Sequence, residues 1–442
     1  MSPPVDPVQS DPKLPKSADV VIIGGGIIGA ATAYYLAKRG MSVAVVEKGR
    51  IAGEQSSRNW GWCRQQDRDR AEIPLIKESL RIWNDLNNEI GAETGFRQTG
   101  VLYVTQDPKE LAKWERWMEH AREYQLHSRL LSSAEAQAMT PGCVQKWIGG
   151  LHTPADGRAE PSMAGPAIAT AARKRGATVH QNCAARGLET EGGAVSGVVT
   201  ELGTIRTKNA LCSGGAWSSL FCRRHGVDLP QLTVRASVQR TEPAPEVFDS
   251  ALGTPDFGIR RRLDGGFTVG YRNQVSFHIT PDAIRYFRKF WPAFRYESRN
   301  IKLEFGSDFW KALFRPSNWP LDQPSPFEEV RILDPKPDIK LLDRALGNFK
   351  MGYPSLKDIK RAETWAGMID ITPDAIPVIS PVEAIPGFFL ATGFSGHGFG
   401  IGPGAGKLAA DMLAGETPIV DLKPFRYSRM IDGTNLQPES RL

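Results

Sequence analysis

The order of apolar and polar residues predicts a strand, a helix and a second strand near the start of the chain. Residues 20–23 (VVII) are all apolar, which is typical of a strand buried on both faces. Residues 30–39 contain helix formers and stop at Gly40. Residues 42–46 form the next apolar run, and Glu47 ends it. A βαβ unit of about thirty residues is therefore expected here.

The same criteria predict helices and strands along the rest of the chain, with no internal repeat. Apolar residues at helical spacing indicate helices at residues 72–90, 108–125, 163–175, 281–289 and 402–413. β-branched and aromatic runs indicate strands at residues 99–105, 178–181, 204–213, 237–241, 266–271 and 387–392. Residues 316–340 are rich in proline and are expected to be irregular.

Length and composition describe an ordinary globular protein with more than one domain. The chain has 442 residues, of which 41% are hydrophobic and 24% are charged, so disordered and fibrous proteins are excluded. At roughly 100–200 residues per domain, two or three domains are expected. The five cysteines form no CxxC pair, which argues against a disulfide framework or a zinc site and fits a reducing compartment. No metal site is predicted.

The N-terminal region lacks the features of a signal peptide or a membrane span. Residues 1–17 are rich in proline and contain no apolar run, so they are expected to form a flexible tail. Residues 20–36 are apolar but are interrupted by four glycines, which fits a strand, a turn and a helix better than a membrane segment. The protein is therefore predicted to be cytoplasmic.

The net charge of +6 is concentrated in one aromatic segment. Residues 260–315 contain twelve Lys and Arg against five Asp and Glu, together with thirteen aromatic residues. The overall excess is too small and too mixed to indicate a nucleic-acid partner. For residues 281–315 three interpretations stay open: a peripheral contact with a quinone or the inner face of a membrane, a helix that covers the substrate domain or a dimer contact, and an electrostatic guide for anionic substrates. The oligomeric state is not predicted.

A glycine motif lies between the first strand and the first helix. Residues 24–29 (GGGIIG) match GxGxxG, in which glycines permit a tight turn and let backbone N–H groups approach a pyrophosphate at the start of a helix. Glu47 ends the second strand, where a carboxylate can accept hydrogen bonds from ribose hydroxyls. The strand, the glycines, the helix and the acidic residue together predict a dinucleotide site.

A second glycine-rich loop lies near the other end of the chain. Residues 389–406 (FLATGFSGHGFGIGPGAG) lead from a strand through the loop into a helix, whose first turn carries a positive dipole. A reduced flavin gains negative charge around N1 and C2=O, and such a helix end would stabilise it. Nicotinamide has no such need, so the loop favours FAD over NAD.

Several segments resemble the D-amino-acid oxidase-like flavoprotein family, in the order in which that family carries them. The segments are residues 24–40 (GGGIIGAATAYYLAKRG), 56–59 (SSRN), 212–217 (CSGGAW), 365–374 (WAGMIDITPD) and 394–406 (FSGHGFGIGPGAG). The family includes glycine oxidase, sarcosine oxidase, sarcosine dehydrogenase and bacterial D-amino-acid dehydrogenases. The resemblance covers most of residues 18–420.

The resemblance implies an α/β fold with two interleaved domains. A Rossmann-type FAD-binding domain would comprise residues 18–90, 150–225 and 360–425, and a substrate domain built on an antiparallel sheet would comprise residues 91–149 and 226–359. Residues 426–442 would form a C-terminal tail. The cofactor would be contacted by Gly24, Gly26, Ile28, Gly29, Glu47, Lys48, Ser57, Arg58, Ala185, Gly214, Trp217, Gly396, His397, Gly398, Phe399 and Gly400.

The implied reaction is oxidation of a CH–NH bond. A hydride passes from the α-carbon of an amino acid to flavin N5, and the imine is then hydrolysed. The substrate would be an amino acid or an N-substituted glycine such as sarcosine or iminodiacetate. Two alternatives stay open: an FAD-dependent 2-hydroxy-acid dehydrogenase of the same family, and a flavoprotein assembly factor without turnover.

Departures from the family pattern refine these expectations. Sarcosine oxidase bonds its flavin to a cysteine where this chain has Gly367, and no histidine precedes His120, so FAD is expected to be bound non-covalently. Glycine oxidase-like members have a carboxylate-binding arginine where this chain has Ile369. Thr268 stands where sarcosine oxidase has the lysine that helps oxygen to react, which favours a dehydrogenase over an oxidase.

Three catalytic candidates remain. Arg64 and Arg272 are rival anchors for the substrate carboxylate, and either could instead be a surface or phosphate-contacting residue. His397 could shape the flavin loop, contact the flavin or carry a proton. Trp60 and Trp62 could form a wall of the substrate pocket or simply pack.

Overall fold

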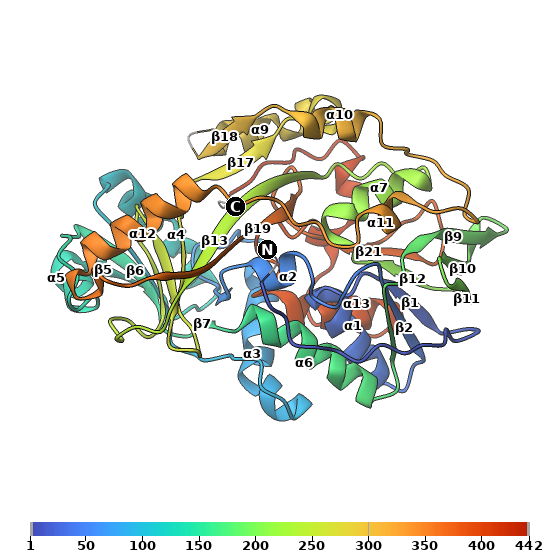
Figure 1. The fold of residues 1–442 in the computed structure, drawn as a ribbon, viewed down its shortest axis with the longest axis horizontal. Helices are drawn as coiled ribbons and strands as arrows, with labels where there is room; N and C mark the ends of the chain where they lie inside the picture. Colours follow the sequence, from blue (N-terminus) through green and yellow to red (C-terminus); the bar gives the residue numbers. More distant parts are fainter. Residues whose placement is uncertain (1–2, 299, 440–442) are drawn as a thin grey trace.

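Two large sheets lie side by side in the computed structural model, which describes residues 3–298 and 300–439 (Figure 1). A six-stranded sheet lies on the right of Figure 1 and a ten-stranded sheet on the left. The chain passes between the two sheets several times, because strands from the N-terminal, middle and C-terminal thirds contribute to each of them. An α/β fold is thus confirmed.

The six-stranded sheet contains the predicted βαβ unit. Its strands, in spatial order, are β20 (Val378–Pro381), β21 (Phe388–Thr392), β12 (Ala210–Cys212), β1 (Val20–Ile23), β2 (Val43–Glu47) and β8 (Thr178–Gln181). All neighbours pair in parallel except β20, which runs antiparallel to β21. This arrangement is that of a doubly wound nucleotide-binding sheet.

Both faces of this sheet are covered, which explains the continuous apolar runs. One face packs against four helices: α1 (Ile27–Lys38), α3 (Ile73–Ile90), α6 (Pro161–Lys174) and α13 (Gly402–Ala414). The other face packs against α7 (Ser218–Arg224) and a three-stranded sheet of β9 (Ala185–Glu191), β10 (Ala194–Thr200) and β11 (Gly203–Arg206). In β1, Val20 and Ile22 face the helices, whereas Val21 and Ile23 face the second layer.

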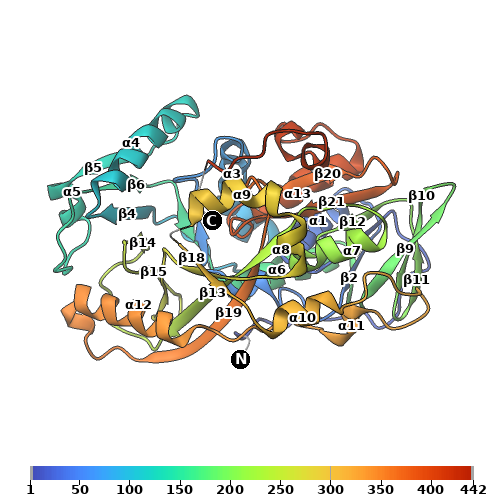
Figure 2. The same ribbon diagram turned by 90° about the horizontal axis from the view of Figure 1, so that it is seen from above.

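The ten-stranded sheet forms the second half of the molecule. Its members are β18 (Ile301–Glu304), β17 (Val275–His278), β13 (Leu232–Thr241), β16 (Phe267–Gly270), β15 (Gly258–Arg261), β14 (Ala251–Gly253), β4 (Val101–Thr105), β6 (Gly149–Thr153) and β5 (Arg129–Ser132), with β19 (Arg361–Ile371) paired to β13. Helix α12 (Ile339–Gly352) and helix α4 (Pro108–Glu123) cover it, as do the short helix α5 (Ser133–Ala138) and nearby loops (Figure 2).

A compact insertion of helices and strands lies on top of the molecule in Figure 1. It contains α8 (Pro281–Arg285), α9 (Phe287–Glu297), β18 and α10 (Ser307–Leu313). The single helix predicted at residues 281–289 is thus two helices. Helix α9 contains Pro292 and continues through it to Glu297. Proline removes only the one N–H that would bond to Arg288.

Three assignments of segments to sheets are corrected by the strand pairing. Strands β6 and β19 were placed in the FAD-binding domain, but β6 pairs with β4 and β5, and β19 pairs along its length with β13. The predicted strand 204–213 is two strands in different sheets, β11 and β12, because the chain turns at Thr207, whose hydroxyl accepts a hydrogen bond from the N–H of Asn209. The predicted irregular segment 316–340 contains the short helix α11 (Pro326–Glu329) and the start of α12.

Both terminal segments are held by specific contacts, which for residues 1–17 contradicts the prediction of a flexible tail. Asp11 forms an ion pair with Arg173 of α6 at 2.7 Å and accepts a hydrogen bond from the N–H of Val179. Near the other end, the buried Arg429 forms an ion pair with Asp374 at 2.8 Å. Within the part of the chain that the structure describes, every helix is too short or too polar to cross a membrane.

Candidate active site

The two glycine-rich motifs meet at one cleft in the six-stranded sheet. The cleft opens at the carboxyl ends of β1, β2 and β12, at the point where the order of the strands in the sheet reverses. Predicted residues that line it are Gly24, Gly26, Ile28, Glu47, Lys48, Ala185, Gly214, Trp217, Gly396, Gly398 and Phe399.

Glycine is required in the first motif because backbone atoms lie where side chains would be. Gly24 has φ +108°, and a Cβ there would lie 2.5 Å from the carbonyl oxygen of Ser213. A Cβ at Gly29 would lie 2.1 Å from the carbonyl oxygen of Gly24, so this glycine lets helix α1 approach the turn. Gly29 is outside the lining of the cleft and acts through packing. The turn therefore leaves a backbone cradle that fits a pyrophosphate at the first turn of α1.

Glu47 is fixed at the edge of the cleft by backbone hydrogen bonds. Its Oε2 accepts a hydrogen bond from the N–H of Gly25 at 2.7 Å, and Oε1 accepts one from the N–H of Gly49 at 2.8 Å. Burial raises the pKa of this carboxyl, although Lys48 and the two N–H groups oppose that effect. The geometry holds the carboxylate at the end of β2, where a ribose would lie.

Three residues from different segments form the far wall of the cleft. Lys48 Nζ lies 2.6 Å from Glu54 Oε1 and 4.5 Å from the centroid of the Trp217 ring. The indole N–H of Trp217 also donates to Glu54 at 3.2 Å. Glu54 was absent from the sequence prediction. It belongs to no motif, because its role is to hold the side chains of Lys48 and Trp217 in place.

Besides Gly29, four predicted cofactor residues lie outside the lining of the cleft and bind other parts of the protein. Ser57 donates to the carbonyl oxygen of Glu54 at 3.2 Å. The buried Arg58 donates to Asp334 at 2.7 Å and to the carbonyl oxygen of Ala366 at 2.8 Å. The carbonyl oxygen of Gly400 accepts hydrogen bonds from the side chains of Ser79 and Trp83. The fourth residue is His397. Direct contact of these residues with a cofactor stays a prediction.

His397 forms a buried pair with Glu72. Its Nδ1 lies 2.7 Å from Glu72 Oε2, and both side chains are almost fully buried. Burial lowers the pKa of His397, so the imidazole is neutral at neutral pH and donates its Nδ1 proton to the carboxylate. The pKa of Glu72 is lowered in spite of burial, because the His397 ring and nearby arginines stabilise the charged form. This contact holds the glycine-rich loop to helix α3 and favours the loop-shaping role.

The two rival arginines lie at the same tyrosine ring, close to the flavin loop. The guanidinium carbon of Arg272 is 3.9 Å from the centroid of the Tyr103 ring, and that of Arg64 is 5.8 Å away. Arg272 also lies 3.4 Å from Glu110, yet its Nη1 is buried without a hydrogen-bond partner among the described residues. The backbone nitrogen of Arg64 is 3.5 Å from where a Cβ of Gly400 would lie. The sequence separates these arginines widely, and the fold brings them together.

A third arginine, which the sequence prediction missed, adjoins this group. Arg68 is buried, its Nη1 lies 3.9 Å from Glu72, and that nitrogen has no hydrogen-bond partner within the described chain. Burial lowers the pKa of Arg68 to about 10, which leaves the side chain charged at neutral pH. Unpaired buried donors are costly unless a ligand or water accepts from them. The cluster of Arg64, Arg68 and Arg272 is therefore suited to an anionic group.

Asp156 supports the turn that carries Arg64. Its carboxyl accepts hydrogen bonds from the N–H groups of Gln65 at 2.9 Å and Gln66 at 3.2 Å. Burial raises the pKa of Asp156 to about 7, although both N–H groups and the nearby arginines oppose that effect. Arg64 itself donates a short hydrogen bond from Nη1 to the carbonyl oxygen of Gln66. The position of Arg64 is thus set by the turn on which it lies.

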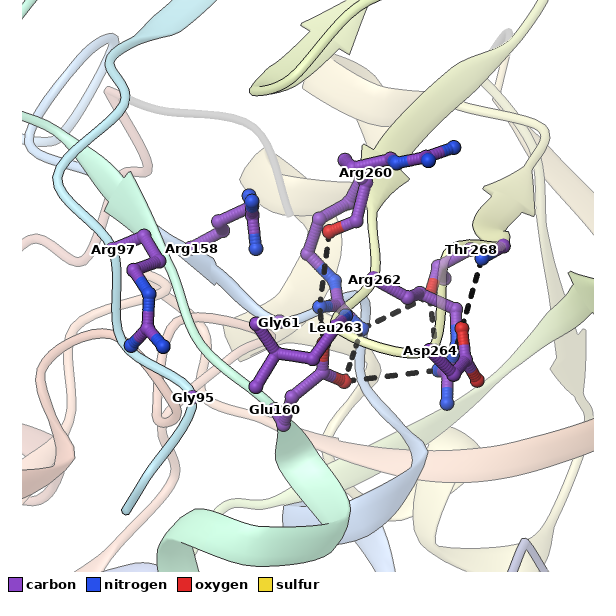
Figure 3. A network of polar contacts seen from close by, with 12 residues as sticks. Gly61, Gly95, Arg97, Arg158, Glu160, Arg260, Arg262, Leu263, Asp264 and Thr268 are labelled. Carbon is purple, nitrogen blue, oxygen red and sulfur yellow. Dashed lines mark hydrogen bonds and ion pairs between the residues drawn. The ribbon is translucent and has the colours of Figure 1, made fainter. Parts of the chain in front are cut away.

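A buried ion pair between Arg260 and Glu160 connects the two halves of the molecule (Figure 3). Arg260 donates to both carboxylate oxygens of Glu160, at 2.7 and 3.0 Å, and its Nε donates to the carbonyl oxygen of Trp60 at 2.6 Å. The Trp60 ring fills the space left by Gly258 and Gly270, where a Cβ would lie 2.2 and 2.5 Å from ring atoms. Trp60 is thus locked in place and meets Trp62 edge to face.

Thr268 is enclosed by the same network. Its hydroxyl accepts hydrogen bonds from Arg260 at 3.1 Å and from Arg262 at 3.4 Å (Figure 3). Glu160, which bonds to Arg260 and lies 3.9 Å from Arg262, balances part of the positive charge. The position at which the family resemblance implied an oxygen-activating lysine is therefore occupied by a small residue held between two paired arginines.

Comparisons with known proteins support the interpretation of the glycine motif as part of a dinucleotide site. The profile of the family described as "DAO: FAD dependent oxidoreductase" matches residues 19–412. Human mitochondrial sarcosine dehydrogenase is 28% identical over 94% of this chain, and mouse mitochondrial dimethylglycine dehydrogenase is 25% identical over 95% of it. The chain spans less than half of the length of these curated relatives, 42% and 45%.

A solved structure matches along nearly its whole length. L-amino acid deaminase from Proteus myxofaciens, in complex with anthranilate, is 33% identical, with a TM-score of 0.93 and 97% of each chain covered.

Proposed function

The chain belongs to the family of FAD-dependent oxidoreductases, and from that premise we propose that it oxidises the C–N bond of an L-amino acid. Bound FAD would accept the hydride from the α-carbon, and the imine would then be hydrolysed. The observation that carries the proposal is the convergence of Arg272 and Arg64 on Tyr103, beside the Gly400 end of the glycine-rich loop. The likeness to L-amino acid deaminase, at 33% identity over 97% of both chains, favours an L-amino acid.

The residues of the cleft would hold FAD without a covalent bond. Gly24 and Gly26 would leave room for the pyrophosphate, and Glu47 would accept from the ribose of the adenosine half. A non-covalent site is supported at Gly367, which has no side chain that could bond to the flavin.

Arg272 would bind the substrate carboxylate. Its buried Nη1 has no hydrogen-bond partner among the described residues, whereas Arg64 Nη1 already donates to the backbone of its own turn. Ile369 lines the cleft with an apolar side chain and cannot replace an arginine in that role. Arg64 would add positive charge, and the tryptophans Trp60 and Trp62 would exclude water from the reacting carbon.

We further propose that the electrons pass to an acceptor other than oxygen. Support comes from Thr268, which offers no ammonium group and is enclosed by the paired Arg260 and Arg262. The predicted dehydrogenase thus remains the favoured form of the enzyme.

The proposed reaction is tested by its products. With an artificial dye acceptor under nitrogen, the holoenzyme should convert an L-amino acid into equal amounts of the 2-oxo acid and ammonia. Sarcosine is the second candidate, because curated relatives at 28% and 27% identity are named sarcosine dehydrogenase. Oxidation of its N-methyl carbon would give glycine and formaldehyde, whereas oxidation of its α-carbon would give glyoxylate and methylamine. A 2-oxo acid formed from a 2-hydroxy acid alone would contradict the proposal and support the alternative of a hydroxy-acid dehydrogenase.

The insertion carries an apolar surface that we propose rests on the inner face of a membrane. Its exposed aromatic residues include Phe314, Phe305 and Trp310, with exposed fractions of 77%, 65% and 52%. Lys311 and Arg315 lie close to them in the sequence and are also exposed, as expected for contact with anionic lipid. Aromatic side chains exposed together are unusual in a monomeric protein and mark an interaction surface.

Replacing Phe305 and Phe314 by glutamate should abolish most binding to lipid vesicles. The two changes remove apolar area and add negative charge at a surface predicted to meet anionic lipid. Cosedimentation with vesicles of mixed anionic and zwitterionic phospholipid measures the effect. Val144→Glu is the control, because Val144 is 57% exposed on a distant loop. Equal sedimentation of the double variant and the wild type would contradict the membrane contact.

A further inference from the structure

A second cavity lies between the ten-stranded sheet and helix α9. Its walls are mostly apolar: Val234 of β13, Phe277 of β17, Ile371 of β19, and Phe290 and Phe294 of α9. Small-molecule sites are typically lined by apolar and aromatic side chains with a few polar groups. The cavity shares no lining residue with the cleft described above.

One carboxyl group lies in this apolar wall. Glu297, at the end of α9, is 7% exposed and lines the cavity. Its Oε2 accepts a hydrogen bond from Asn300 at 2.9 Å, whereas Oε1 has no hydrogen-bond partner in the described part of the chain. A buried polar atom of this kind is costly unless a ligand or water pairs with it. The Glu297 carboxyl group therefore favours a ligand that can form a hydrogen bond with it and disfavours an anionic ligand.

Strand β19 and the glycine-rich loop separate this cavity from the FAD cleft. Met368 and Ile369 of β19 line the cleft. Ile371, at the end of the same strand, and Thr372, which follows it, line the cavity. The N–H of Thr372 donates at 3.2 Å to Ser395, which lies in the loop between the cleft residues Phe394 and Gly396. The two spaces are therefore on opposite sides of one layer of backbone.

Helix α9 separates the same cavity from the proposed membrane surface. Its residues Phe290 and Phe294 face the cavity, whereas its residues Phe287 and Trp291 are 56% and 43% exposed. A ligand that partitions into lipid could thus reach the cavity from the surface that we expect to rest on the membrane. The cavity lies between that surface and the FAD cleft.

We propose that this cavity binds the ring of a lipid-soluble quinone, with Glu297 hydrogen-bonded to one ring oxygen. The inference rests on the proposed transfer of electrons to an acceptor other than oxygen. Reduction of a quinone to the quinol takes up two electrons and two protons, and FADH₂ releases the same number as it returns to FAD. A protonated Glu297 can donate to a quinone carbonyl, and an ionised one can accept from a quinol hydroxyl.

The binding of a short-chain benzoquinone to the oxidised holoenzyme tests the proposal. Isothermal titration calorimetry should show one saturable site in the wild type. Ala293→Phe fills the cavity and should raise Kd about tenfold or more, and Glu297→Leu removes the hydrogen bond and should raise Kd several-fold. Both variants should retain their FAD and their dye-linked turnover. Phe287→Ser, on the outer face of α9, should bind the soluble quinone as the wild type does.

The failure of this inference is distinguishable from failure of the proposed function. If the wild type turns over amino acids with a dye but binds no quinone, or if Ala293→Phe and Glu297→Leu both bind it with unchanged Kd, the cavity assignment is overturned alone. If no amino acid is oxidised with any acceptor, the proposed function fails instead, and quinone binding by calorimetry still decides the cavity. Should Ala293→Phe fail to fold, Glu297→Leu against Phe287→Ser gives the same decision.

Discussion

Replacing Gly29 by alanine is expected to yield a protein that is purified without FAD. The new Cβ would lie 2.1 Å from the carbonyl oxygen of Gly24 and 2.8 Å from Ser213 Oγ. Real Cβ atoms do not approach backbone oxygens so closely, so helix α1 must move away from the turn that precedes it. That movement opens the cradle for the pyrophosphate, and we expect FAD affinity to fall by at least about 100-fold, or ~2.7 kcal/mol.

The effect is measured by adding FAD to the apoprotein and following the quenching of flavin fluorescence. Gly347→Ala is the matched control: Gly347 lies in helix α12, nothing is within 4 Å of a Cβ there, and alanine is the better helix former. It should retain FAD like the wild type. A Gly29→Ala protein that carries a full complement of FAD would contradict the role given to the glycine motif.

Replacing Arg272 by methionine is expected to lower kcat/KM for a carboxylate substrate by about 10- to 100-fold. A hydrogen bond between charged groups contributes ~1.5–3 kcal/mol, and methionine keeps much of the volume of arginine without its donors. Most of the loss should appear in KM, because the arginine binds a part of the substrate that does not react. Arg64→Met should have a smaller effect, because its Nη1 already donates to the backbone of Gln66.

Steady-state kinetics with a dye acceptor measure these effects, and the same substrate converted to its amide gives the internal control. The amide lacks the carboxylate, so its kcat/KM should be poor in the wild type and should change little in Arg272→Met. Arg261→Met controls for the loss of any arginine from this sheet, because Arg261 stacks on Phe267 away from Tyr103. If Arg272→Met and Arg64→Met both leave KM unchanged, neither arginine is the anchor.

The βαβ unit and its glycine motif could be predicted from the sequence because all of their signals are local. The apolar run of β1, the glycines of the turn and Glu47 follow one another within a short stretch, and each is dictated by its own neighbours in the sequence. The same holds for the glycine-rich loop before α13. These segments need no information about distant parts of the chain, and the structure brings them to one cleft.

The remainder of the site depends on contacts between residues that are far apart in the chain. His397 and Glu72 are 325 positions apart, and their pairing explains why His397 is bonded to the protein, whereas burial by distant parts of the chain lowers its pKa. Strand β19 carries family motif residues, but its pairing with β13 places it in the other sheet. The sequence does not mark Arg68, because an arginine on an irregular segment belongs to no recognisable motif. Only the folded structure shows that it is buried with a nitrogen that lacks a hydrogen-bond partner among the described residues. Tertiary packing, which the sequence pattern does not contain, decides these features.

The central claim is that FAD in this protein is reduced by an amino acid, and anaerobic reduction of the purified yellow holoenzyme tests it most directly. Under nitrogen, the flavin absorbance should bleach on addition of at least one L-amino acid from a panel that also contains sarcosine, D-amino acids and 2-hydroxy acids. Dithionite serves as the control that the flavin is reducible. The account is contradicted if dithionite bleaches the flavin while no amino acid does, or if only 2-hydroxy acids do.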